Sequence, residues 1–422
     1  MEKFSGYRCS ICGTEYVPGD AIYTCPKDGG NLDVLLDYES IKAKYKPEDI
    51  FSRNDPSLWR YLPLLPVRVP EGDSTPLHAA GGTPVFRLTS LAEKLGLQSV
   101  WLKDESRNPT ASFKDRASAI VVARAQEVEA DVVVTASTGN AGAALAGMSA
   151  AVGQKAVIFA PKSAPQAKVA QLLIFGAKVI LVDGTYDDAF DLTIKAAQEF
   201  GWYCRNTGYN PFTAEGKKTA AFEIWEWWQE GHREFHNRIG EGIDHKPLTV
   251  FVSVGDGNII SGIHKGFKDL VKLGWMPRVP RIVGVQAEGS AAIANAFLGN
   301  TETITPVSAK TLADSISVDL PRDGVRAVRA AKETDGTYIT VSDEEILKAI
   351  AELGRVGIFA EPAGATAYAG LVKGTAFGVV GGEEPVLVLN TGSGLKDVRA
   401  AMQAVVEAPI IEPTLEAVKK VL

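Results

Sequence analysis

Short apolar runs that alternate with helical stretches constrain the fold of this chain more than any other feature. The runs with the character of β-strands lie at residues 99–102, 131–135, 155–159, 178–182, 249–254, 281–285 and 385–389. A helical stretch follows each run, and Ser342-Asp-Glu-Glu345 has the capping-box pattern before a helix that reaches Gly354. Short, wholly apolar strands separated by helices predict an α/β fold in which helices cover both faces of a parallel sheet.

The segment Asn108-Pro-Thr-Ala-Ser-Phe-Lys114-Asp-Arg116 puts one lysine at the start of a predicted helix. A turn precedes Lys114, and Ser112 is able to cap the helix. Unpaired N–H groups give a helix N-terminus partial positive charge, so an ammonium group is disfavoured there. A neutral amine that acts as a nucleophile toward an aldehyde suits the position. On these residues alone, a surface lysine that follows a turn explains the segment equally well.

Three later segments have the form of ligand-binding turns. Ala136-Ser-Thr-Gly-Asn140 follows the predicted strand 131–135, and its small residues expose N–H donors suited to an anion. Val254-Gly-Asp-Gly-Asn258 follows the strand 249–254, and its glycines let the backbone approach a phosphate at a helix start. Leu389-Asn-Thr-Gly-Ser-Gly-Leu-Lys-Asp397 follows the last predicted strand. Taken singly, each segment is also an ordinary turn between a strand and a helix.

Together and in this order, the four segments resemble the motifs of the fold-type-II pyridoxal-phosphate enzymes, the relatives of the tryptophan synthase β-chain. The resemblance extends from about Gly81 to Asp397. The form Asn-Pro-Thr-x-Ser-Phe-Lys-Asp-Arg is typical of the threonine synthases in this family, whereas the cysteine synthases usually carry Gly-Ser-Val-Lys-Asp-Arg. The resemblance therefore implies an enzyme, a lyase, with pyridoxal 5'-phosphate as its cofactor.

The resemblance also implies a role for each motif. Lys114 is expected to form the Schiff base with the cofactor and to act as the catalytic base. Asn140 is expected to bond the cofactor's phenolic oxygen, and the Thr391 hydroxyl its pyridine nitrogen. The cofactor phosphate is expected on the backbone amides of Gly255, Asp256, Gly257, Asn258 and Ile259. The substrate carboxylate is expected at Ser137, Thr138 and Gly139. Because a carboxylate repels a phosphate, the side chain of Asp256 is expected to point away.

Substrate identity depends on a fifth segment, Glu215-Gly-Lys-Lys218-Thr219, which resembles the family's Glu-Gly-x-Lys-Thr. A phosphorylated substrate needs a cation, and Lys218 is the candidate, with two lysines on a solvated helix face as the alternative. The implied reaction converts O-phospho-L-homoserine and water to L-threonine and phosphate. Bacterial threonine synthases often carry an arginine within a segment that here reads 311–321, and this chain lacks it. Cysteate synthesis from phosphoserine, threonine or serine dehydration, and an inactive cofactor-binding protein therefore stay open as alternatives.

The division of the chain is a further implication of the resemblance. Two doubly wound parallel-sheet domains are expected. The larger, cofactor-binding domain comprises residues 76–124 and 211–422, and a small domain of residues 125–210 is inserted into it. Residues 1–75 form an accessory segment at the N-terminus, joined to the rest by the proline-rich stretch 63–76.

Three of the four cysteines lie within the first 25 residues. Cys9-Ser-Ile-Cys12 has the form of one half of a zinc ribbon. Cys25-Pro-Lys-Asp28 has the form of the second half, with an aspartate in place of the last cysteine. A closed zinc site needs a fourth ligand, which here is Asp28, the distant Cys204, or nothing. A metal-free remnant of such a ribbon is the preferred interpretation, and zinc at the three clustered cysteines is the alternative.

Composition limits the partners and the location of the chain. Its 422 residues, 45% of them hydrophobic, can bury a large core. A net charge of −7 argues against nucleic acid or an anionic membrane as a partner. A cytoplasmic location is expected, because no apolar stretch approaches the roughly 20 residues of a membrane span. A small-molecule substrate is what the resemblance implies. A homodimer is compatible with the sequence, which does not fix the oligomeric state.

Overall fold

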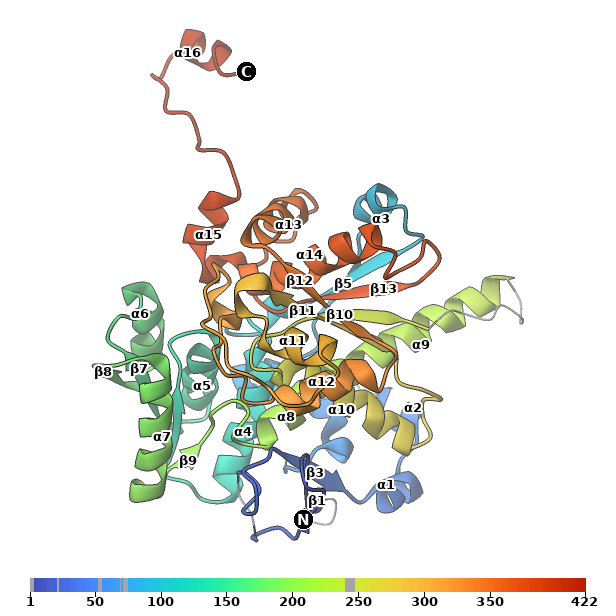
Figure 1. Ribbon diagram of the computed structural model, residues 1–422, viewed down its shortest axis with the longest axis vertical. Helices are drawn as coiled ribbons and strands as arrows, with labels where there is room; N and C mark the ends of the chain where they lie inside the picture. The colour runs from blue at the N-terminus through green and yellow to red at the C-terminus, as the bar shows by residue number, and fades with distance from the viewer. Residues whose placement is uncertain (1–3, 21–22, 52–54, 69, 71–74, 240–246) are drawn as a thin grey trace.

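The computed structural model describes residues 4–20, 23–51, 55–68, 70, 75–239 and 247–422. Figure 1 shows a small sheet near the N-terminus, a large α/β body, and a smaller α/β unit at one side of that body. The proline-rich stretch 63–76 is described only in part, because residues 69 and 71–74 lie outside the described residues.

The strands form three sheets, with the orders β2-β1-β3, β12-β11-β10-β13-β5-β4 and β8-β7-β6-β9. The N-terminal sheet is antiparallel and consists of β1 (Phe4–Cys9), β2 (Glu15–Tyr16) and β3 (Leu32–Leu36). The large sheet consists of β4 (Val85–Arg87), β5 (Val100–Asp104), β10 (Thr249–Ser253), β11 (Arg281–Ala287), β12 (Thr337–Val341) and β13 (Val386–Asn390). The small sheet consists of β6 (Val132–Ala136), β7 (Lys155–Pro161), β8 (Lys178–Val182) and β9 (Tyr203–Cys204).

The predicted α/β fold with parallel sheets is confirmed. Each of the apolar runs forms a strand, and every strand pair in the two larger sheets is parallel except the edge pair β4–β5. The strands β6, β10 and β13 are buried at every residue, because helices pack on both faces of each sheet. Strands β4, β9 and β12 were not among the predicted runs.

The helices of the N-terminal segment and of the body up to β6 are α1 (Tyr38–Lys44), α2 (Pro47–Phe51), α3 (Thr89–Leu95) and α4 (Lys114–Glu127). Those of the smaller unit are α5 (Asn140–Ala151), α6 (Gln166–Ile174) and α7 (Tyr186–Phe200). The rest are α8 (Phe212–Lys217), α9 (Thr219–Ile239), α10 (Asn258–Lys272), α11 (Ala292–Leu298), α12 (Gly324–Lys332), α13 (Asp343–Arg355), α14 (Pro362–Ala376), α15 (Val398–Gln403) and α16 (Leu415–Lys419). Short 3₁₀ turns are η1 (Leu58–Leu64), η2 (Pro76–Ala79), η3 (Glu105–Arg107), η4 (Glu288–Ser290), η5 (Asp314–Ile316) and η6 (Gly394–Lys396).

The capping box predicted before α13 is confirmed. The Ser342 hydroxyl accepts the backbone N–H of Glu345 at 3.2 Å, and the Glu345 carboxylate accepts the N–H of Ser342 at 2.7 Å. Two N–H groups that the helix itself leaves unpaired are thereby satisfied. The helix ends at Arg355, one residue beyond the predicted limit.

The arrangement of the sheets determines where a ligand can bind. The strands of the small sheet lie between residues 132 and 204, within the predicted small domain, whose limits remain a prediction. Ligands of open parallel sheets bind at the carboxyl ends of the strands, so the loops after β6, β10 and β13 are the ones to inspect. Among the described residues, no helix is long and apolar enough to cross a membrane.

Candidate active site

Lys114 is the first residue of α4, and Asp115 holds the turn before it. The Asp115 carboxylate accepts hydrogen bonds from the backbone N–H of Thr110, at 2.6 Å, and from the Thr110 hydroxyl. The cap predicted at Ser112 is wrong, because its buried Oγ has no hydrogen-bond partner among the described residues. Phe113 already has helical φ and ψ and occupies the cap position. Ser112 therefore lies one residue too early to reach the free amides of the first turn.

Arg116 anchors the same helix to the body through a buried ionic network. Its guanidinium lies 2.7 Å from a carboxylate oxygen of Glu105 and 2.7 Å from one of Glu223. Lys103, on β5, donates to Glu223 at 2.7 Å. Breaking a buried network by removing one partner costs about 3–5 kcal/mol, so these contacts hold the start of α4 in one place.

Lys114 lines two adjoining cavities, of about 40 Å³ and about 380 Å³. The smaller cavity is also lined by the loop 255–259, Lys217, Glu361 and Thr391. The walls of the larger cavity include the loop 136–141. The structure therefore brings together these predicted site residues: Lys114, Ser137, Thr138, Gly139, Asn140, Gly255, Asp256, Gly257, Asn258, Ile259 and Thr391.

The loop between β10 and α10 needs glycine at two positions. A Cβ on Gly255 would lie 2.8 Å from Cα of Ile316, and one on Gly257 would lie 2.6 Å from the carbonyl oxygen of Asp323. Gly257 also has a φ of +88°, which L-residues with a side chain rarely adopt. Gly257 is the N-cap of the 15-residue helix α10, and the first residues of that helix line the smaller cavity. The unpaired amides and the helix dipole at this end favour a phosphate.

The carboxylate of Asp256 is directed at the turn that precedes α12. One of its oxygens accepts the backbone N–H of Arg322 at 3.3 Å, and its carbonyl oxygen accepts the N–H of Asp323 at 2.9 Å. Burial raises the pKa of Asp256, and the hydrogen bond from Arg322 opposes that rise.

Glu361 is a residue of the site that was not predicted from the sequence. It lies at the N-cap of α14, is 3% exposed, and accepts hydrogen bonds from the Asn140 amide at 2.8 and 3.0 Å. Burial lowers the pKa of Lys114, and the carboxylate of Glu361 opposes that shift. Burial likewise raises the pKa of Glu361, while the Asn140 amide and Lys114 oppose it. The only signal in the sequence was the Glu-Pro pair at a helix start, which is common.

The structure does not bring Lys218 to the cavities, so the predicted role of Lys218 in substrate binding is not retained. The Lys218 side chain is fully buried, with its Nζ 2.5 Å from Glu215 and 2.8 Å from Asp269. Lys217, which precedes it, lines the smaller cavity and donates to the Asn258 side chain at 2.5 Å. Successive side chains of a helix point about 100° apart, so the two lysines point in different directions and contact different partners. Burial places the pKa of Lys217 well below its ordinary value.

The chemistry of these walls fits a phosphorylated, polar aromatic cofactor. The glycine loop ends at the start of α10, where backbone amides can bind a phosphate, and the volume of about 380 Å³ lies within the roughly 300–1,000 Å³ of small-molecule sites. Buried polar groups on the wall of the smaller cavity include Ser253 Oγ, which has no hydrogen-bond partner among the described residues. Unpaired buried polar groups are costly, and a polar ligand would satisfy them.

Comparison with known proteins agrees with this site. The family model for pyridoxal-phosphate-dependent enzymes matches residues 77–392. The chain is 39% identical to a threonine synthase of Methanocaldococcus jannaschii and 36% identical to one of Methanosarcina acetivorans, covering 98% of this chain and 98% of each relative. A solved structure, the processed form of threonine deaminase isoform 2 from Solanum lycopersicum, matches with a TM-score of 0.64 and 22% identity, over 81% of this chain and 92% of that one.

The family match and the fold thus define a pyridoxal-phosphate-dependent enzyme of fold type II, a lyase. The identities of 36–39% over nearly the whole chain decide the group within that class. The chain belongs to the threonine synthase family.

Proposed function

We propose that this enzyme makes L-threonine from O-phospho-L-homoserine and water, with release of inorganic phosphate. One observation carries the proposal: Lys217, whose amine would bind a phosphate on the substrate, lines the cavity that Lys114 and the loop 255–259 also line. The cofactor phosphate takes up the amides at the start of α10, so a phosphate on the substrate needs a cation of its own. Arg205 adds positive charge near Lys114 and Lys217, and together with burial it lowers the pKa of both. The negative charge of a substrate phosphate would oppose that shift and favour the charged form of Lys217.

The proposed chemistry moves protons at Lys114. When bound, the cofactor supplies an electron sink that makes the α- and β-protons of an amino acid acidic. Burial keeps Lys114 Nζ nearer to neutrality than a free lysine, so the amine can accept the α-proton and return protons afterwards. The γ C–O bond breaks and phosphate leaves, the hydroxyl group of water is added to the β carbon, and the γ carbon gains the proton that the β carbon has lost. The second proton of water goes to the phosphate. The overall reaction is balanced by one water and one released phosphate.

The remaining residues of the site would hold and orient the cofactor and the substrate. The amides and hydroxyls of Ser137, Thr138 and Gly139 would hold the substrate carboxylate at the start of α5. Asn140 would bond the cofactor's phenolic oxygen, with Glu361 holding its amide in place. Thr391 would bond the pyridine nitrogen, and a hydroxyl there makes the ring a weaker electron sink than a carboxylate would. That suits elimination and replacement on the side chain.

The proposal is tested by phosphate release from phosphohomoserine and phosphoserine, measured beside 2-oxo acid release from threonine and serine. Threonine formation with phosphate release from phosphohomoserine alone is the expected result. Phosphate release from phosphoserine with no threonine formed would favour the replacement reaction, and 2-oxo acid release would favour the dehydratase.

Lys217→Met tests the phosphate-binding role. We expect kcat/KM for phosphohomoserine to fall by roughly 10²-fold, because a charge-assisted bond contributes about 1.5–3 kcal/mol and stabilisation of the leaving group adds to it. Cofactor content should stay unchanged if the loop 255–259 binds the cofactor phosphate. A fall in cofactor content with an unchanged kcat/KM of the loaded enzyme would instead assign Lys217 to the cofactor.

Location and assembly are part of the same proposal. A cytoplasmic location is supported by the four cysteines, none of which forms a disulfide in the described part of the chain. A homodimer is supported by the C-terminal segment 404–422, which extends away from the body in Figure 1 and exposes apolar side chains such as Val406, Ile410 and Leu422. Light scattering of the full chain and of a chain that ends at residue 403 tests the dimer. A dimer that persists after the truncation would show that the subunits contact each other through another surface.

A further inference from the structure

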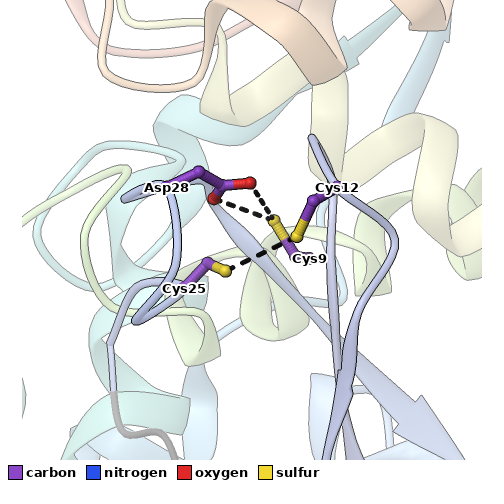
Figure 2. A group of neighbouring side chains, drawn as sticks. All are labelled: Cys9, Cys12, Cys25 and Asp28. Carbon is purple, nitrogen blue, oxygen red and sulfur yellow. Dashed lines mark hydrogen bonds between the residues drawn. The ribbon is translucent and has the colours of Figure 1, made fainter.

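Four side chains at the N-terminus form a cluster that the proposed reaction does not use. Figure 2 shows Cys9 and Cys12 at the end of β1 and in the turn after it, facing Cys25 and Asp28 on a second turn. One ligand atom from each residue lies within 4.8 Å of all the others. The two turns come from separate parts of the sequence, so the folded chain brings the four groups together.

We propose that Cys9, Cys12, Cys25 and Asp28 bind one zinc ion. A tetrahedral zinc with Zn–S bonds of about 2.3 Å requires sulfur atoms about 3.8 Å apart. The Sγ atoms of Cys12 and Cys25 are 3.8 Å apart, far longer than the ~2.05 Å of a disulfide. Cys9 Sγ lies 3.3 and 3.7 Å from the two carboxylate oxygens of Asp28, near the roughly 3.5 Å expected between a sulfur and an oxygen ligand.

The ligand set selects the kind of metal. Three thiolates with one carboxylate favour zinc over calcium or magnesium, which take oxygen ligands. All four tetrahedral positions are taken by protein groups, which is typical of a structural rather than a catalytic ion. Asp28 is the fourth ligand in this geometry, and Cys204, the other candidate from the sequence, is not part of the cluster.

Groups behind the ligands are placed as they are around structural zinc. The backbone N–H of Ile11 donates to Cys9 Sγ at 3.3 Å, and the N–H of Gly30 donates to an Asp28 oxygen at 2.9 Å. The Tyr16 hydroxyl lies 3.1 Å from Cys25 Sγ, where it can donate to a thiolate. Such outer hydrogen bonds orient the ligands and offset the negative charge of a site with three thiolates.

The ion would fix a turn that contacts the catalytic body. Asn31 follows the second zinc turn, and its amide donates to the carbonyl oxygens of Gly208 and, at 2.9 Å, of Arg322. Arg322 lines the larger cavity, and so does Thr207, the residue before Gly208. We infer a structural role, in which the zinc stabilises the N-terminal sheet against the walls of the site without touching the reacting groups.

The first test measures metal in the full-length enzyme purified with its cofactor and without a metal-affinity step. About one zinc per chain is expected in the wild type and in Cys204→Ala, the matched cysteine control. Cys12→Ser and Asp28→Asn should each weaken zinc binding by at least about tenfold in a competition titration with a chelator. Equal zinc affinity in these variants and the wild type would overturn the proposal.

A second measurement covers the case in which a variant does not fold. Cobalt(II) added to the chelator-treated wild type should give the intense visible d–d bands of a tetrahedral thiolate site, and the melting temperature should recover. Six-coordinate cobalt spectra, or wild-type enzyme without zinc and without a stability response to it, would reject the site. Catalytic rate per folded, cofactor-loaded Cys12→Ser chain should be nearly unchanged, and a lost rate at unchanged melting temperature would contradict the structural role.

Discussion

Lys114 and Glu361 lie on the wall of the same cavity, and burial moves their pKa values toward each other. It lowers the pKa of the Lys114 amine and raises that of the Glu361 carboxyl, because the interior disfavours either charge. Each group also stabilises the charge of the other. The proton affinity of the amine therefore depends on a residue that is 247 positions away in the sequence, taken as the difference between residues 361 and 114.

Lys114→Ala should abolish turnover and covalent attachment of the cofactor. The only amine proposed to bond the cofactor would be gone, although the phosphate loop and Thr391 remain to bind it non-covalently. Borohydride reduction followed by intact-mass measurement checks the prediction: the wild type should gain the mass of the reduced cofactor, and the variant should not. A variant that still traps the cofactor would show that another lysine, such as Lys217 on the same wall, makes the bond.

Glu361→Gln should shift the acid limb of the kcat/KM profile to lower pH. The sign follows from the contact: the carboxylate raises the pKa of Lys114, so its removal lowers the pH at which the amine loses its proton. A lowered pKa keeps the amine neutral over more of the acidic range. Glu344→Gln, at an exposed position on α13, is the matched control and should leave the profile unchanged. A shift to higher pH would contradict the assigned contact.

Single residues were the level at which the sequence was least reliable. Lys114, Asn140 and Thr391 are brought to one cavity region as expected, because their motifs lie at the carboxyl ends of strands. Lys218 was chosen over Lys217, although one residue on a helix decides which side a lysine faces. Glu361 was missed because its partners, Asn140 and Lys114, are distant in the sequence.

At the scale of elements, the start of α10 illustrates how a helix position and a glycine depend on each other. The amides of its first turn can bind a phosphate only if the chain enters with the positive φ of Gly257. The same residue approaches the carbonyl of Asp323 and the side chain of Ala327, where a Cβ would lie 2.6 and 2.8 Å away. A side chain at position 257 is therefore disfavoured both by the backbone conformation and by the lack of space around it.

Gly257→Ala should destabilise the protein and weaken cofactor binding by at least about tenfold, because the displaced amides lose charge-assisted bonds to the phosphate. Gly274→Ala is the matched control, since Gly274 has a φ of +73° but open space within 4 Å of the place that a Cβ would take. The control should cost only the roughly 1–2 kcal/mol of left-handed strain and leave cofactor affinity unchanged. Thermal unfolding and cofactor titration separate the two effects, and equal cofactor affinity in both variants would contradict the steric argument.

The elements themselves were largely predictable. Every wholly apolar run became a strand, because a strand between two helical layers has no polar face. Strand β12 carries threonines at 337 and 340, both only partly buried, so it lacked that signal. Strand β9 has two residues, too few for any periodicity, and it forms only because β6 pairs with it.

At the scale of the whole molecule, a line of polar contacts, buried from Arg326 inward, joins the N-terminal sheet to the proposed phosphate loop. Asp33 on β3 lies 2.7 Å from Arg326 of α12, and Arg326 lies 2.6 Å from Asp323. Asp323 in turn accepts the side-chain amide of Asn258, the first residue of α10, at 2.7 Å. The accessory segment is therefore connected to the site by more than its hydrophobic packing. This connection could not be predicted from the sequence, because the four residues have no pattern in common.

Arg326→Met should lower both stability and cofactor affinity. The substitution keeps most of the side-chain length but leaves the fully buried carboxylate of Asp323 without its cation, at a cost of about 3–5 kcal/mol. The substitution should also affect Asn258, whose side-chain amide donates to Asp323. Without Arg326, the Asp323 carboxylate should shift and displace Asn258 from the position that the phosphate loop requires. The expected results are a lower melting temperature with the cofactor bound and a weaker affinity for the cofactor in a titration.

Arg329→Met, on the same helix, is the control that distinguishes this line of contacts from general attachment of the N-terminal segment. Arg329 also reaches that segment, through the carbonyl oxygen of Ser10, and pairs with Glu302, but its side chain is 32% exposed and makes no contact with Asp323 among those described. Because exposed ion pairs contribute about 0–1 kcal/mol, its loss should lower stability slightly and leave cofactor affinity unchanged. If both variants lose cofactor affinity equally, the N-terminal segment as a whole, rather than Arg326 and Asp323, supports the site.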